Sequence, residues 1–88
     1  MPWRVRVDDK AAKQIEKLDK TVSGRILKFL RQLESLDNPR TKGEPLIEER
    51  FKGLWRYRVS DYRLLCDIRD GELVVLVVDV EYRSKVYR

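Results

Sequence analysis

The segment Leu54-Trp55-Arg56-Tyr57-Arg58-Val59-Ser60-Asp61-Tyr62-Arg63-Leu64-Leu65 decides the fold of this chain. Apolar side chains alternate with Arg56 and Arg58 before Ser60-Asp61, and the alternation resumes after it, which is the period of a half-buried β-strand. A two-residue turn at Ser60-Asp61 places Arg58 directly opposite Arg63. We therefore predict a hairpin with one apolar face and one face that carries all three arginines.

Three arginines on one sheet face need an explanation, since like charges directly opposite each other destabilise a β-ladder. An anion that binds between them would supply one. The cluster depends on the length of the turn, because a one-residue bulge would move Arg63 to the other face.

Patterns before the hairpin predict an α+β fold. Residues 3–7 alternate and predict an N-terminal strand. Two amphipathic helices follow, the first capped by Asp8 or Asp9 and the second ended by Asp37-Asn38-Pro39. Asp19-Lys20-Thr21 separates them, and so short a connection predicts an antiparallel αα-hairpin.

Residues 40–50 are predicted to form a loop, and its Glu48-Glu49 pair is more typical of a solvated surface than of a general base. Further on, Asp70-Gly71 predicts a second tight turn. Residues 73–80 are almost uninterrupted aliphatic, as in a central strand covered on both faces. These segments complete a three-strand antiparallel meander with both helices packed on one face.

Apolar residues share the arginine side of the sheet in the register that Asp70-Gly71 predicts. Because the two helices can cover only one face, either the last residues of the chain or a partner protein must cover this side. The apolar residues concerned are Leu65, Val74, Leu76 and Val78.

Composition narrows the possible functions. At 88 residues the chain is expected to be a single domain, residues 1–88, and its net charge of +5 favours nucleic acid as a partner over an acidic protein or a membrane surface. Such a charge can also serve solubility alone.

The chain has no histidine, so His-based acid/base chemistry and His–metal hydrolysis are excluded within it. Its one cysteine, Cys66, cannot form an internal disulfide and is expected to be buried. Without a signal peptide or a transmembrane run, we expect a cytoplasmic protein.

RNA is the simplest substrate that such a chain could cleave. Arginines bind phosphate bidentately and can stabilise the negative charge of a pentavalent transition state. The 2′-hydroxyl of RNA is a built-in nucleophile, so no metal or cofactor is required. Tyrosine and tryptophan side chains offer stacking platforms for bases.

The order of the predicted elements resembles the RelE/ParE superfamily of bacterial toxin–antitoxin toxins. Two phrases carry the resemblance most specifically, Lys52-Gly53-Leu54-Trp55-Arg56-Tyr57-Arg58-Val59-Ser60-Asp61-Tyr62-Arg63-Leu64 and Glu81-Tyr82-Arg83-Ser84-Lys85-Val86-Tyr87-Arg88. The resemblance implies the RelE-like microbial RNase fold and, for the RelE branch, a ribosome-dependent endonuclease that cuts mRNA in the A site. Cleavage in that branch uses the 2′-hydroxyl without a metal and leaves a 2′,3′-cyclic phosphate.

The resemblance also implies site residues. Arg56 and Arg58 fall where well-known members have two lysines, and Arg63 falls on the arginine that stabilises the transition state. The catalytic set carried over is Arg56, Arg58, Arg63, Arg83 and Tyr87. The RNA-binding set is Lys52, Tyr82, Lys85 and Arg88. Because Tyr82 stands where many relatives have histidine, neither a general acid nor a general base is evident.

The partners implied by the resemblance are the ribosome with its mRNA and a cognate RelB-like antitoxin, through which alone the toxin reaches operator DNA. The antitoxin is expected to be acidic or amphipathic. Two other functions stay open: a ParE-like inhibitor of DNA gyrase, and a non-catalytic RNA-binding module. The arginine cluster favours RNA chemistry over gyrase inhibition, which needs no such array of phosphate ligands.

Overall fold

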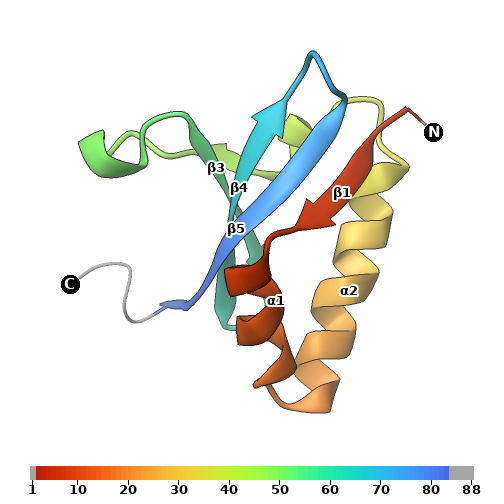
Figure 1. Cartoon of the computed structure of the whole chain (residues 1–88), viewed down its shortest axis with the longest axis vertical. Coiled ribbons are helices and arrows are strands. Elements are labelled where there is room, and N and C mark those ends of the chain that lie inside the picture. The colour runs from red at the N-terminus through yellow and green to blue at the C-terminus, as the bar shows by residue number, and fades with distance from the viewer. Residues whose placement is uncertain (1, 84–88) are drawn as a thin grey trace.

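The computed structural model describes residues 2–83, which form a five-stranded sheet in the order β1-β5-β4-β3-β2. The first strand, β1 (Arg4–Val7), runs parallel to β5 (Val74–Tyr82). The remaining neighbours are antiparallel, namely β4 (Tyr62–Arg69), β3 (Leu54–Val59) and β2 (Glu44–Pro45). The α+β fold, with its N-terminal strand, helix pair and three-strand meander, is confirmed (Figure 1).

The first helix, α1 (Asp9–Glu16), begins at an aspartate cap, as predicted. The side chain of Asp8 accepts a hydrogen bond of 2.8 Å from the backbone N–H of Ala11. Such a cap satisfies an N–H that has no partner within the helix and stabilises it by about 0.5–2 kcal/mol. Ala11 and Ile15 on the same side of the helix are buried.

The second helix, α2 (Lys20–Glu34), is capped by Asp19, which accepts a hydrogen bond of 3.2 Å from the backbone N–H of Thr21. The prediction that Asp19-Lys20-Thr21 separates the helices was therefore wrong by two residues, because the capping aspartate draws Lys20 and Thr21 into the helix. No helix within residues 2–83 is both long and apolar enough to cross a membrane.

Both helices pack on one face of the sheet and enclose the main core. The sheet contributes alternate residues of β3, β4 and β5, and Trp3 closes the end of the core beside β1. The buried core comprises Trp3, Ala11, Ile15, Ile26, Leu30, Leu33, Tyr57, Val59, Leu64, Cys66, Ile68, Val75, Val77 and Val80. Burial of Cys66 is confirmed, and desolvation raises the pKa of its thiol.

The turn between β4 and β5 is longer than predicted. Arg69 pairs with Val74, so residues 70–73 all lie in the connection, and the register predicted from a tight Asp70-Gly71 turn was wrong by two residues. A shift of two keeps every side chain on its face. Leu65 and Val74 are accordingly buried on the face opposite the helices.

A β-bulge interrupts β5 at Val78 and was not predicted. Cys66 pairs with Val77, but the next pair is Leu65 with Asp79, so Val78 is an extra residue. Beyond the bulge Val80 returns to the helix-covered core, whereas Asp79 faces the same side as Leu65. The prediction of a regular, uninterrupted strand through Val78 was therefore wrong.

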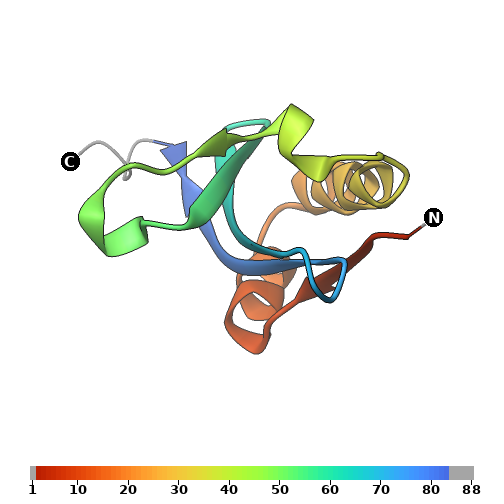
Figure 2. The ribbon, with the colours of Figure 1, turned by 90° about the horizontal axis from the view of Figure 1, so that it is seen from above.

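Residues 40–50 are more ordered than the predicted loop. They contain part of η1 (Pro39–Lys42), the short strand β2 and the start of η2 (Glu49–Phe51). The buried hydroxyl of Tyr57 donates a hydrogen bond of 2.9 Å to the carbonyl of Pro39 and fixes η1 against the sheet. Between β2 and β3 the chain projects on the side away from α2 (Figure 2).

Candidate functional site

The hairpin between β3 and β4 has the predicted two-residue turn. Ser60 adopts the left-handed conformation, with φ of 55°, and Asp61 follows it. Arg58 pairs directly with Arg63, and Arg56 pairs with Leu65. These side chains share the face opposite the helices, which we call the arginine face and define by Arg56, Arg58, Arg63 and Leu65.

The three arginines have different environments. Arg58 is exposed and makes no hydrogen bond or ion pair within residues 2–83. Arg56 is half-buried and forms an ion pair with Glu44. Arg63 is only 4% exposed, and its Nη1 donates a hydrogen bond of 2.7 Å to the backbone carbonyl of Arg83. An incoming anion therefore meets Arg58 first, while Arg63 supplies positive charge from below the surface.

Arg83 is held beside the hairpin turn. Its backbone N–H donates a hydrogen bond of 2.9 Å to the carbonyl of Asp61, and its Nε lies 3.8 Å from Oδ1 of Asp61. Together with the bond from Arg63, these contacts anchor the end of β5 at the arginine face. The structure thus brings together four predicted site residues: Arg56, Arg58, Arg63 and Arg83.

Other predicted residues lie elsewhere. Tyr82 pairs with Tyr62, and the two rings meet edge to face with centroids 5.4 Å apart. The register puts this pair on the side of the sheet that the helices cover, away from the arginines. Lys52 is exposed and follows η2 on the projecting segment. Tyr87, Lys85 and Arg88 lie outside the described residues.

Two glutamates, which sequence reasoning did not single out, flank the arginines. Glu44 of β2 pairs with Arg56, and the hydrogen bond from Arg56 lowers the pKa of its carboxyl, assisted by the charges of Arg56, Arg58 and Arg63. Across the sheet, Glu81 of β5 pairs with Arg63. Glu44 could not be found from sequence because a strand of two residues shows no alternation. Glu81 could not be found because the bulge changes which residues of β5 share a face with the arginines. The predicted Glu48-Glu49 pair is exposed.

Comparison with known proteins identifies the family. A model of the family described as the ParE toxin of the type II toxin–antitoxin system parDE matches residues 5–87. The chain belongs to this toxin family. The match spans nearly the whole sequence, including most of β1, both helices and the arginine face, and confirms the superfamily predicted from the two sequence phrases.

Relatives of the toxin bear RelE-type names. Toxin RelE of Mycobacterium tuberculosis is 30% identical over 87 residues, which cover 99% of this chain and 88% of the relative. Toxin RelG of the same organism is 31% identical over 88 residues, covering 100% of this chain and 99% of the relative. Among solved structures, the toxin–antitoxin complex RelBE2 of M. tuberculosis matches with a TM-score of 0.82 and 28% identity, covering 94% of this chain and 100% of that one.

The toxin's arginine face can bind a phosphodiester and hold groups that transfer protons. Guanidinium groups stay charged at any biological pH and bind phosphate oxygens in pairs. Carboxyl groups on both sides of the arginines differ in their affinity for a proton, since the pKa of Glu44 is lowered and that of Glu81 is raised. Such divergence between two carboxyls of one site is typical of acid/base pairs, and here β3 and β4 lie between them.

Proposed function

We propose that this toxin is a ribosome-dependent mRNA endonuclease that cleaves mRNA in the A site and thereby stops translation. The observation that carries the proposal is the arginine face, where exposed Arg58 lies opposite buried Arg63, whose guanidinium binds the backbone carbonyl of Arg83. A gyrase inhibitor has no need of three guanidinium groups converging on one small area. The RelE-type names of the relatives support the same branch.

Cleavage would proceed by attack of the 2′-hydroxyl on the adjacent phosphorus. The bond from O2′ to phosphorus forms, the bond from phosphorus to O5′ breaks, and the products are a 2′,3′-cyclic phosphate and a 5′-hydroxyl. Arg58 and Arg83 would contact the non-bridging oxygens, where negative charge grows in the transition state. Arg63 would stabilise the same charge from beneath, without the mobility of a surface side chain.

Glu44 is the group proposed to accept the proton of the 2′-hydroxyl. The hydrogen bond from Arg56 lowers its pKa, which makes it a weaker base but fixes an ionised carboxylate beside the arginines, the form that accepts a proton. Arg56 would then orient Glu44 rather than bind phosphate. This differs from the phosphate-binding role predicted for Arg56 from the sequence.

A RelB-like antitoxin is the proposed inhibitor. The similar solved structure from M. tuberculosis is that of a toxin–antitoxin complex, RelBE2. In this chain, an amphipathic segment with acidic residues would bury the accessible parts of Leu76 and Val78 and place its carboxylates against Arg58. Such a segment occupies the place of the mRNA phosphates, which would explain inhibition. Operator DNA would be contacted through the antitoxin alone.

The test adds the purified toxin to translating ribosomes and maps the 5′ ends of the mRNA. We expect cuts at codon-spaced positions, and a loss of at least about 100-fold in rate for Arg58→Ala, since one preorganised charge contributes about that much. Because Arg58 is exposed, this variant should fold normally. Lys28→Ala on the exposed side of α2 removes an equal charge far from the arginine face and should cut at the wild-type rate.

The outcome separates the candidate functions. Intact mRNA with inhibited DNA supercoiling by gyrase would replace the proposal with a ParE-like activity. Intact mRNA and active gyrase would favour a non-catalytic RNA-binding module. Equal cutting by wild type and Arg58→Ala would remove the arginine face from the mechanism.

A further inference from the structure

The bulge at Val78 changes which residues of β5 lie on the arginine side of the sheet. Beyond it Asp79 and Glu81 pair with Leu65 and Arg63, so both carboxyls join the arginine side of the sheet. Side chains of directly paired residues have Cβ atoms about 4.5–5.5 Å apart. Glu81 on β5 therefore pairs with Arg63 on β4, and Arg63 in turn pairs with Arg58 on β3.

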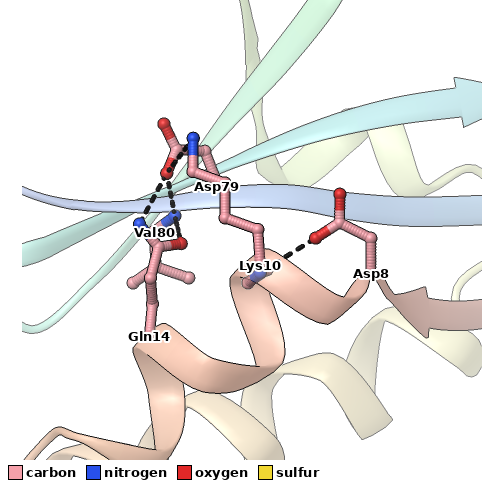
Figure 3. Close-up of polar contacts among 6 residues, drawn as sticks. Asp8, Lys10, Gln14, Asp79 and Val80 are labelled. Carbon is pink, nitrogen blue, oxygen red and sulfur yellow. Dashed lines mark hydrogen bonds and ion pairs between the residues drawn. The ribbon is translucent and has the colours of Figure 1, made fainter.

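Contacts from α1 hold Asp79 in place. The Nε2 of Gln14 donates a hydrogen bond of 2.8 Å to Oδ1 of Asp79, and Nζ of Lys10 lies 3.6 Å from the same oxygen. The other end of the Gln14 amide accepts a hydrogen bond of 2.9 Å from the backbone N–H of Val80 (Figure 3). Since β1 ends at Val7, Gln14 occupies the edge of β5 that β1 leaves open. Asp79 is thus anchored to α1 by Gln14 and Lys10.

The surroundings of Glu81 favour its protonated form. Desolvation raises the pKa of its carboxyl most, and the hydrogen bond and negative charge of Asp79 raise it further, while Lys10 and Arg50 oppose the shift. Asp79 shows the reverse: desolvation disfavours its charge, but the hydrogen bonds from Gln14 and Glu81 and the charge of Lys10 together lower its pKa. The pair therefore holds its proton on Glu81.

We propose that Glu81 is the general acid of the cleavage reaction and that Asp79 is the residue that positions it. This inference rests on the proposed endonuclease function. As the bond from phosphorus to O5′ breaks, Glu81 gives its proton to O5′, which leaves as a hydroxyl, and the charges of Lys10 and Arg50 favour the carboxylate that remains. The 2′-hydroxyl proton goes to Glu44. Because Glu44 gains one proton and Glu81 loses one, the number of protons on the enzyme is unchanged.

A modified mRNA tests the assignment directly. In this mRNA, sulfur replaces the bridging O5′ at the cleaved phosphate. A thiol has a pKa of about 8.5, so a thiolate leaves without needing a proton. We expect Glu81→Gln to cut normal mRNA on ribosomes about 100- to 10,000-fold more slowly than wild type, the usual contribution of a general acid. On the sulfur-substituted mRNA the same variant should approach the wild-type rate.

Three further variants complete the design. Arg58→Ala should stay slow on both substrates, because charge stabilisation is needed whichever atom leaves. Glu72→Gln, an exposed carboxyl in the β4–β5 connection, should match wild type on both. Asp79→Asn removes the charge that raises the pKa of Glu81, so the fall in activity with rising pH should move to lower pH. In Glu81→Gln that fall should disappear.

Two results would overturn the assignment. One is a Glu81→Gln rate equal to wild type on normal mRNA, and the other is an equal defect on both substrates, which would mean that Glu81 only supports the fold. Failure of the proposed function looks different, because wild-type toxin would then leave both mRNAs intact.

Discussion

Replacing Gly43 with alanine should destabilise the toxin through a steric clash at the start of β2. A Cβ at this position would lie 2.8 Å from Cε1 of Tyr57 and 3.0 Å from the carbonyl oxygen of Arg56. Neither neighbour can yield easily, since Tyr57 is fully buried and its hydroxyl is bonded to Pro39. The φ of Gly43 is −125°, so the glycine is required by the close approach and not by its backbone conformation.

The expected cost follows from overpacking a buried site, which typically destabilises by about 1–3 kcal/mol. For a domain of this size, each kcal/mol lowers the midpoint of thermal unfolding by about 4–8 °C. Circular dichroism melts of wild type and Gly43→Ala measure this shift. Displacement of β2 from β3 should also separate Glu44 from Arg56, so mRNA cleavage should slow at temperatures where the variant is still folded.

Gly24→Ala is the matched control. Gly24 lies inside α2, and a Cβ added there meets nothing within 4 Å. Alanine in an exposed helix interior is more stable than glycine by about 0.5–1 kcal/mol, so this variant should melt above wild type. Gly43→Ala melting at or above the wild-type temperature would refute the packing argument, whatever the control shows.

Three other expectations follow from single contacts. Because the Cys66 thiol is fully buried and desolvation raises its pKa, Ellman's reagent should modify it only in unfolded toxin, and fast labelling of the native protein would contradict its position. Asp8→Ala should lower the free energy of unfolding in urea by about 0.5–2 kcal/mol through loss of the α1 cap, and an unchanged midpoint would show that the cap contributes nothing. Arg40→Ala removes a bidentate pair with exposed Asp70 and should lower the free energy of unfolding by no more than about 1 kcal/mol, and by less at high salt. A larger loss would indicate that the contact of Arg40 with the Trp55 ring dominates.

The hairpin and the helices could be predicted because their patterns are local. Alternation around Ser60-Asp61 identifies two strands, their turn and the pairing of Arg58 with Arg63, all of which the structure confirms. The caps at Asp8 and Asp19 are equally local, although one of them was misread as a break. Period and capping depend only on residues a few positions apart, so a single sequence is sufficient to reveal them.

The bulge and the burial of Arg63 could not be predicted in the same way. Residues 74–78 are all aliphatic, so an extra residue within them changes no pattern. The burial of Arg63 depends on residues far away in the sequence, including the carbonyl of Arg83 that its guanidinium meets. A charged residue on a strand is ordinarily expected at the surface. Both errors concern contacts between β4 and β5, where local periodicity carries no information.

The acidic residues around the arginines change the explanation for the cluster itself. From sequence, three arginines on one face seemed to require an external anion, because Arg58 and Arg63 repel each other. The structure supplies one negative charge from within the chain, since the carboxylate of Glu44 is paired with Arg56. This carboxylate offsets part of the repulsion among the arginines. Arg58 has no such acidic partner within residues 2–83. It follows that Arg58 should contribute most to the initial capture of phosphate, whereas replacing Arg56 should chiefly disturb Glu44.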